Sequence, residues 1–91
     1  MKFIIIDGAL LRNKSLVPGG KLIISYLSNL QKAGKCYYGG FEYLSDVLGL
    51  SLEVTTKICQ SYFKRGLIKQ DSDGIRLTHD FSFYCTYNNI Q

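Results

Sequence analysis

The sequence predicts a small α+β domain, and two features of the chain carry this prediction. Apolar residues recur at helical spacing on both sides of residues 49–51, a short connection that begins with a glycine and ends with a serine. The glycine suits the left-handed end of one helix, and the serine suits the capped start of the next. Further along, residues 71–74 read Asp-Ser-Asp-Gly between two β-prone runs, which is a strong hairpin signal.

The chain before this region predicts a strand, a short helix and one long helix. Residues 3–6 are an apolar, β-branched run that favours a strand. Asp7 suits the cap of a short helix over residues 9–12. Pro18 fits the first turn of the long helix, where its missing N–H costs nothing, and Gly34 ends it. The apolar face of this main core helix comprises Leu22, Ile23, Tyr26, Leu27 and Leu30.

After an extended segment at residues 35–38, a pair of helices is expected around the turn at Gly49. Gly40 is a tolerable N-cap for the first of them. The second runs over residues 51–65 with Ser51 as its N-cap, and Gly66 ends it. The core side of the first helix comprises Phe41, Leu44, Val47 and Leu48. The core side of the second comprises Thr55, Ile58, Cys59, Tyr62 and Phe63. Helix, glycine turn and capped helix is the pattern of a helix-turn-helix.

The rest of the chain predicts β structure. Residues 67–70 and 75–78 form the hairpin, which is a wing because it directly follows the helix-turn-helix. Residues 80–87 alternate, with apolar and aromatic side chains at every second position, as in a strand. The edge of such a strand could pair with a second copy, so a homodimer is a candidate. We therefore expect one winged helix-turn-helix domain over residues 1–91, with three or four helices and with residues 78–91 as an extra strand and tail.

The composition limits which classes of function are compatible with the sequence. The 91 residues carry a formal net charge of +4 and a pI near 9.0, which permits a nucleic-acid partner without demanding one. Three widely spaced cysteines and a single histidine, His79, favour reduced thiols in a cytoplasmic protein over a disulfide scaffold or a metal site. No apolar run is long enough for a signal peptide or a membrane span. No catalytic constellation is recognisable, so we expect neither an enzyme nor a cofactor.

Several short segments in order make the chain similar to a known family. It resembles the winged-helix domain at the N-terminus of phage and plasmid replication initiators and of DnaD-like replication proteins. The resemblance covers residues 3–78. Its segments are residues 10–11, 16–22, 26–27, 34, 36–37, 43–44, 48–51 and 66–68. It implies a winged-helix fold and a DNA-binding role in replication.

The chain departs from that family at three places. Gly39 and Gly40 stand where the family usually has proline and serine. Leu52 and Glu53 follow the helix-opening serine, where the family usually has arginine or lysine. The tip of the wing carries Asp71 and Asp73 in place of basic residues. The second and third changes remove attraction for phosphate where a winged helix usually meets DNA.

The second helix is the expected reader of DNA. On its outer face, Thr56 and Gln60 could bond to base edges in a major groove, and Lys57 and Lys64 could meet phosphates. Ordinary solvated helix residues are the alternative interpretation of these side chains. The predicted DNA-contacting set is Ser51, Leu52, Thr56, Lys57, Gln60, Lys64 and, from the wing, Arg76.

Two functions follow, from different classes. The first is a double-stranded-DNA-binding protein with a role in DNA replication or transcription regulation of a phage or plasmid. The second is a protein-interaction module of a mobile element, which binds and modulates a host or phage protein. Leu52, Glu53 and the acidic wing favour the second function. A DNA binder should lose affinity steeply with salt, whereas a protein binder should depend on Leu52 and aromatic side chains.

Overall fold

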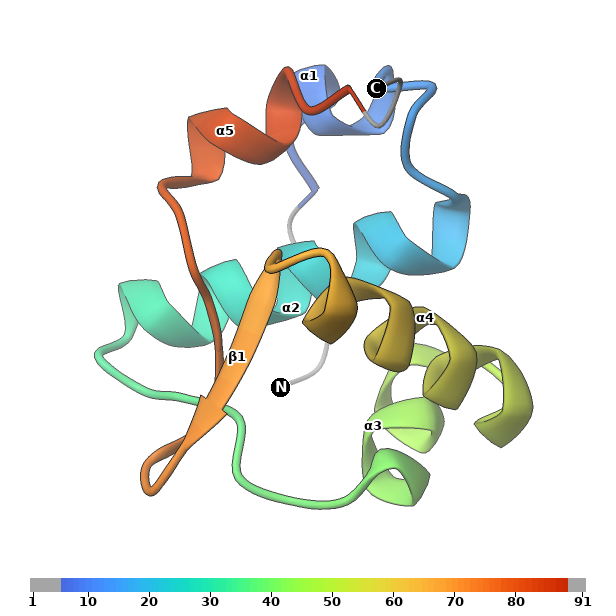
Figure 1. Cartoon of the computed structure of the whole chain (residues 1–91), viewed down its shortest axis with the longest axis vertical. Coiled ribbons are helices and arrows are strands. Elements are labelled where there is room, and N and C mark those ends of the chain that lie inside the picture. Colours follow the sequence, from blue (N-terminus) through green and yellow to red (C-terminus); the bar gives the residue numbers. More distant parts are fainter. Residues whose placement is uncertain (1–5, 89–91) are drawn as a thin grey trace.

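A computed structural model describes residues 6–88 of the chain and shows an α+β fold (Figure 1). Its elements in chain order are α1 (Gly8–Leu11), α2 (Pro18–Lys32), α3 (Phe41–Leu48), α4 (Leu52–Lys64), β1 (Ile68–Asp71), β2 (Gly74–Leu77) and α5 (Phe81–Cys85). The predicted order of helices followed by a hairpin is confirmed. Most of the predicted first strand and the end of the predicted tail lie outside the described residues.

The turn between α3 and α4 forms as its sequence predicts. Gly49 has a φ of +69°, a left-handed conformation that favours glycine, and its N–H bonds back to carbonyls of α3. The hydroxyl of Ser51 accepts a hydrogen bond from the N–H of Val54 at 3.1 Å, so one orphan donor at the start of α4 is satisfied. Helix α3 packs against α4, and this pair is the helix-turn-helix of the fold.

Helix α2 is the central helix, because it contacts α1, α4 and β2. Pro18 occupies its first turn, and the N–H of Lys35 bonds to the carbonyl of Leu30 at 2.8 Å beyond its C-terminus. The predicted apolar face is present, with Ile24 as an additional buried member. The helix therefore positions α4 on one side and the hairpin on another.

The hairpin pairs in the predicted place, with Ile68 opposite Leu77 and Asp71 opposite Gly74. The predicted extended segment joins it through Tyr37, which exchanges two backbone hydrogen bonds with Ile75 at 3.0 and 2.7 Å. Gly74 is required here: its φ is +126°, and a Cβ at this position would lie 2.2 Å from the carbonyl oxygen of Tyr37.

The predicted strand at residues 80–87 is wrong, because Phe81–Cys85 forms helix α5. In the helix, Tyr84 is fully buried and its hydroxyl donates to the carbonyl oxygen of Leu67 at 2.5 Å. The side-chain amide of Asn13 donates to the carbonyls of Tyr84, Cys85 and Tyr87 at 2.8, 3.2 and 2.9 Å. These contacts add donors for the carbonyls at the helix end, where the carbonyl of Tyr84 also accepts from the N–H of Tyr87 at 3.4 Å. The strand edge on which the predicted homodimer rested is therefore a helix.

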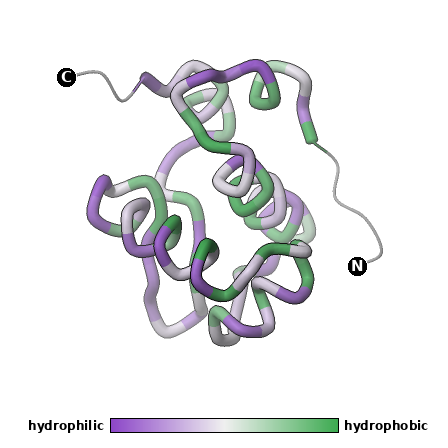
Figure 2. Tube along the Cα trace, turned by 90° about the vertical axis from the view of Figure 1, so that its right-hand side faces the viewer, coloured by the Kyte–Doolittle hydropathy of each residue, from purple (hydrophilic) through white to green (hydrophobic). Residues whose placement is uncertain are grey.

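The helices and the hairpin share one hydrophobic core. In Figure 2, hydrophobic and hydrophilic residues alternate along the helices, as expected for helices with one buried face. No helix within residues 6–88 is both long and apolar enough to cross a bilayer. The buried apolar residues are Leu10, Leu16, Ile23, Ile24, Tyr26, Leu27, Tyr37, Leu44, Leu48, Cys59, Tyr62, Leu67, Ile68, Ile75, Leu77 and Tyr84.

Candidate nucleic-acid interface

Helix α4 has one face in the core and the opposite face in solvent. Thr55, Cys59 and Tyr62 are buried, as the helical spacing predicts. Six of the seven predicted contact residues lie at or on the other face, where all are exposed except the half-buried Thr56. These six are Ser51, Leu52, Thr56, Lys57, Gln60 and Lys64. The exposed face of α4 therefore presents polar and cationic side chains together with the apolar Leu52 and Val54 and the acidic Glu53 near its start.

Lys57 is partly compensated by an acidic neighbour on the same helix. Its Nζ lies 3.3 Å from Oε2 of Glu53, one turn earlier, and the two side chains are 74% and 77% exposed. Such solvated pairs contribute about 0.3–0.5 kcal/mol, because water screens them and both side chains lose freedom. Lys57 can therefore exchange this partner for a phosphate at little cost.

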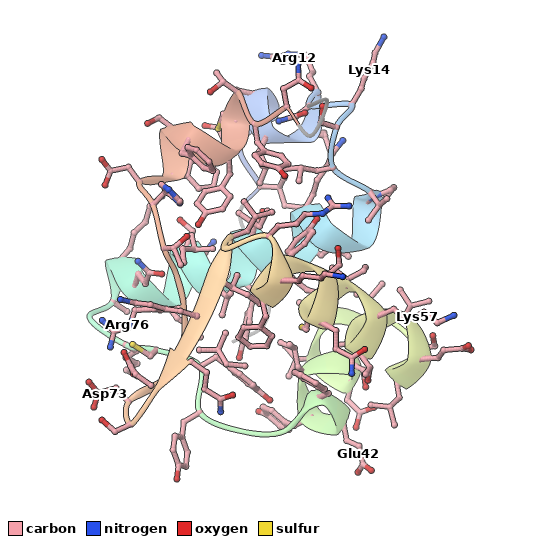
Figure 3. All side chains as sticks on the ribbon, viewed as in Figure 1. Arg12, Lys14, Glu42, Lys57, Asp73 and Arg76 are labelled. Carbon is pink, nitrogen blue, oxygen red and sulfur yellow. The ribbon has the colours of Figure 1, made fainter. Side chains whose placement is uncertain are left out.

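Arg76 is not brought together with the helix residues. Its guanidinium lies 3.0 Å from a carboxylate oxygen of Asp71 and 3.4 Å from one of Asp73. A hydrogen bond from the backbone N–H of Asp73, with Arg76 adding to it, holds the pKa of Asp71 below its ordinary value. In Figure 3, Arg76 and Asp73 lie at the hairpin, on the other side of the molecule from Lys57. Arg76, the predicted DNA contact from the wing, thus pairs with the acidic side chains at the turn of the hairpin instead.

A groove between α3 and α4 was not predicted. It has a volume of about 550 Å³ and is lined by Gly40, Phe41, Glu42, Tyr43, Leu52 and Thr56. Tyr43 is 62% exposed and Leu52 is 45% exposed, so the groove offers apolar surface beside a carboxylate. The feature of the sequence that points to this groove is Tyr43, an aromatic residue on the side of its helix that does not face the core.

A second, smaller groove separates α4 from the chain before α2. Its volume is about 220 Å³, and its lining is Ser15, Val17, Lys57, Ile58, Ser61, Tyr62 and Arg65. Lys57 and Ser61 lie on α4 and Arg65 is its C-cap, so the three residues follow one another at a spacing of four that the sequence displays. Arg65 is not in the predicted contact set, and the structure places it at the C-cap of α4.

The nucleophilic and titratable groups elsewhere are dispersed. Burial raises the pKa of the Cys59 thiol to about 11, whereas Cys36 and Cys85 are half-buried free thiols. The ring of His79 stacks on Phe83 with centroids 3.9 Å apart, and its Nδ1 lies 2.8 Å from the hydroxyl of Thr78. Within residues 6–88, no group of three or more His, Cys, Asp or Glu side chains could hold a metal ion.

The fold and the exposed helix together define a small α+β domain of winged-helix-like architecture with a solvent-facing second helix in its helix-turn-helix. No protein-family model, curated protein or solved structure matches the chain.

Proposed function

We propose that this protein binds double-stranded DNA, with α4 in the major groove. The observation that carries the proposal is the outer face of α4, which is solvent-exposed from Leu52 to Lys64 and is capped at its start by Ser51. An α-helix fits the major groove in width. Thr56 and Gln60 would bond to base edges, and Lys57 and Lys64 would meet phosphates.

The proposed setting is the cytoplasm, with a role in DNA replication or transcription regulation of a phage or plasmid. The resemblance of residues 3–78 to replication initiators supports the replication and phage or plasmid setting. The three free cysteines of the described chain support a reducing compartment.

The test is fluorescence anisotropy of a labelled mixed-sequence duplex at low and moderate salt. Replacing both Lys57 and Lys64 by alanine should weaken duplex binding about tenfold or more at low salt. It should also reduce the slope of log affinity against log salt concentration by about 0.9 for each lost phosphate contact. Glu53→Ala should strengthen binding, because it frees Lys57 and removes a charge that repels phosphate. Absence of wild-type binding even at low salt would reject the proposal.

The groove between α3 and α4 favours a second candidate function, the protein-interaction module. Exposed Tyr43 and Leu52 are the kind of apolar anchors that protein interfaces bury, and Glu42 beside them would select a basic partner segment. Under this function, Leu52→Ser should abolish capture of a partner from host lysate. If Leu52→Ser loses duplex binding, and the wild type captures no protein that stays bound at high salt, DNA binding is favoured instead.

A further inference from the structure

The groove between α4 and the chain before α2 has cationic and hydroxyl groups in its lining. Arg65 and Lys57 supply two cations, of which Lys57 is also paired with Glu53 outside the groove lining, and Ser15 and Ser61 supply two hydroxyl groups. A volume of about 220 Å³ accommodates a phosphate group together with water. Arginine and hydroxyl donors are common partners of phosphate oxygens in proteins.

The floor of the groove contains a polar group that lacks a partner. Tyr62 is only 3% exposed, and its hydroxyl makes no hydrogen bond to any of the described residues. Buried hydroxyl groups are nearly always paired, so the hydroxyl of Tyr62 is an exception, which it shares with Ser25 and Thr55 among the described residues. Burial raises the pKa of Tyr62 to about 12, although Arg65 opposes this rise. At neutral pH the hydroxyl therefore keeps its proton, and it can donate a hydrogen bond to a phosphate oxygen only when the groove opens enough to expose its oxygen, which is inaccessible in the structure.

The hydroxyl of Tyr62 lies at the positive end of α2. A Cβ at Gly20, in the first turn of α2, would lie 1.8 Å from this oxygen. The first-turn N–H groups of a helix have no acceptor within the helix, and Val17, the N-cap, has no side-chain oxygen to offer them. Val17 also lines the groove, so the positive end of the 15-residue helix lies at its rim.

The loop that carries Ser15 is held in place before any ligand binds. The backbone N–H of Ser15 donates to the side-chain oxygen of Asn13 at 2.8 Å, while the amide nitrogen of Asn13 binds carbonyls at the end of α5. Ser15 also borders a neighbouring cavity of about 400 Å³ that is lined by Arg12. Figure 3 shows Arg12 and Lys14 projecting outward above this region. Cationic surface therefore continues from the groove onto the loop before α2.

We propose that this groove is a phosphate site and that a backbone phosphate of duplex DNA occupies it. The assignment to DNA rests on the proposed function. A helix in the major groove, which is about 12 Å wide, has phosphates on both flanks. At the wing, Asp71 and Asp73 repel phosphate and occupy Arg76. On the opposite flank, Lys57 belongs both to the outer face of α4 and to the groove. The α2 side of α4 would thus replace the wing as the main backbone contact.

The experiment compares Arg65→Gln and Tyr62→Phe with Lys69→Gln, an exposed charge on β1 that serves as the matched control. Duplex affinity is measured over a salt series. A parallel arm titrates inorganic phosphate against chloride at equal ionic strength and follows the amide resonances of Ser15, Ser61 and Arg65. We expect Arg65→Gln to weaken duplex binding about tenfold and to lower the salt slope by about 0.9, and Lys69→Gln to change affinity less than about twofold. Tyr62→Phe should weaken binding several-fold without loss of folding.

The outcomes separate the two proposals. If the wild type binds duplex and Arg65→Gln behaves like Lys69→Gln, the phosphate site is rejected while DNA binding by α4 stands. If the wild type binds no duplex but inorganic phosphate shifts the three amides and Arg65→Gln abolishes the shifts, the site is supported with free phosphate as its ligand and the DNA function is rejected. If neither duplex nor phosphate has any effect, both proposals fail.

Discussion

Gly20 on α2 lies directly against the phenol ring of Tyr62 on α4. A Cβ at residue 20 would lie 1.8 Å from the hydroxyl oxygen and 2.7 Å from Cζ of that ring. Because the ring is buried, it cannot swing away as an exposed side chain would. The first turn of α2 and the end of α4 can therefore meet this closely only if residue 20 is glycine.

Gly20→Ala should accordingly lower the free energy of unfolding by about 1–3 kcal/mol, in spite of the better helix propensity of alanine. Chemical denaturation measures this loss. Gly8→Ala is the matched control, because the Cβ added there would meet only the mobile end of Arg12 at 3.1 Å. Equal stabilities of the two variants would show that α2 and α4 are not packed as described.

Two buried tyrosines form a matched pair for a test of hydrogen bonding. The hydroxyl of Tyr84 donates to the carbonyl of Leu67 and lies 3.0 Å from the backbone nitrogen of Thr78, whereas that of Tyr62 has no partner within residues 6–88. Tyr84→Phe should cost about 1–3 kcal/mol of unfolding free energy, because it leaves buried partners unsatisfied. Tyr62→Phe should leave the unfolding free energy unchanged or raise it. The reverse ranking in urea denaturation would contradict both assignments.

Asn13 connects the loop before α2 to the C-terminal helix. Its side chain bonds to three carbonyls at the end of α5 and to the N–H of Ser15. Asn13→Ala should lower the unfolding free energy by about 1–3 kcal/mol and accelerate hydrogen exchange of the α5 amides. Gln60→Ala, on the exposed face of α4, is the control. Unchanged exchange in α5 would mean that Asn13 does not hold this helix.

The acidic turn of the hairpin predicts a pH dependence. Asp71 accepts a hydrogen bond from the N–H of Asp73 and lies beside Arg76, so its pKa is lower in the folded than in the unfolded chain. Its stabilisation is therefore present above the unfolded pKa and is lost as the pH falls through the folded pKa. Carboxyl NMR titration should show this lowered pKa.

The same titration can separate the causes of the shift. In Arg76→Gln the pKa of Asp71 should rise only part of the way, because the stronger contribution, the Asp73 hydrogen bond, remains. Lys14→Gln serves as the control, since Figure 3 places Lys14 at the opposite end of the molecule from the hairpin. A full return to the ordinary value in Arg76→Gln would assign the shift to the guanidinium alone.

The elements that the sequence predicts well are those whose ends depend on local chemistry. Gly49, Ser51 and Pro18 each act within a few residues of their own position, so their roles are readable without the fold. The error at α5 has a different origin. Phe81, Tyr84 and Cys85 have the spacing of one face of a helix, while the same stretch also alternates as a strand does. Contacts with residues distant in the sequence decide in favour of the helix. Leu67 and Asn13 cannot be identified as those residues from the local sequence.

The same contrast holds for the candidate interface. The inward and outward faces of α4 follow from its 3.6-residue period, so its exposed residues were predicted. The fate of Arg76 depends on side chains across the turn of the hairpin, and the groove at Arg65 depends on the approach of α2. Such features arise from tertiary packing and require the structure.

The burial of Cys59 on the inner face of α4 makes thiol labelling a measure of how often this helix leaves the core. Cys36 and Cys85 are only half-buried, so a thiol reagent should modify them first. Cys59 can react only after α4 opens, since its thiol is both inaccessible and protonated at neutral pH. Its labelling rate, compared with the global unfolding rate, would show whether the proposed reader helix detaches by itself or only when the whole chain unfolds.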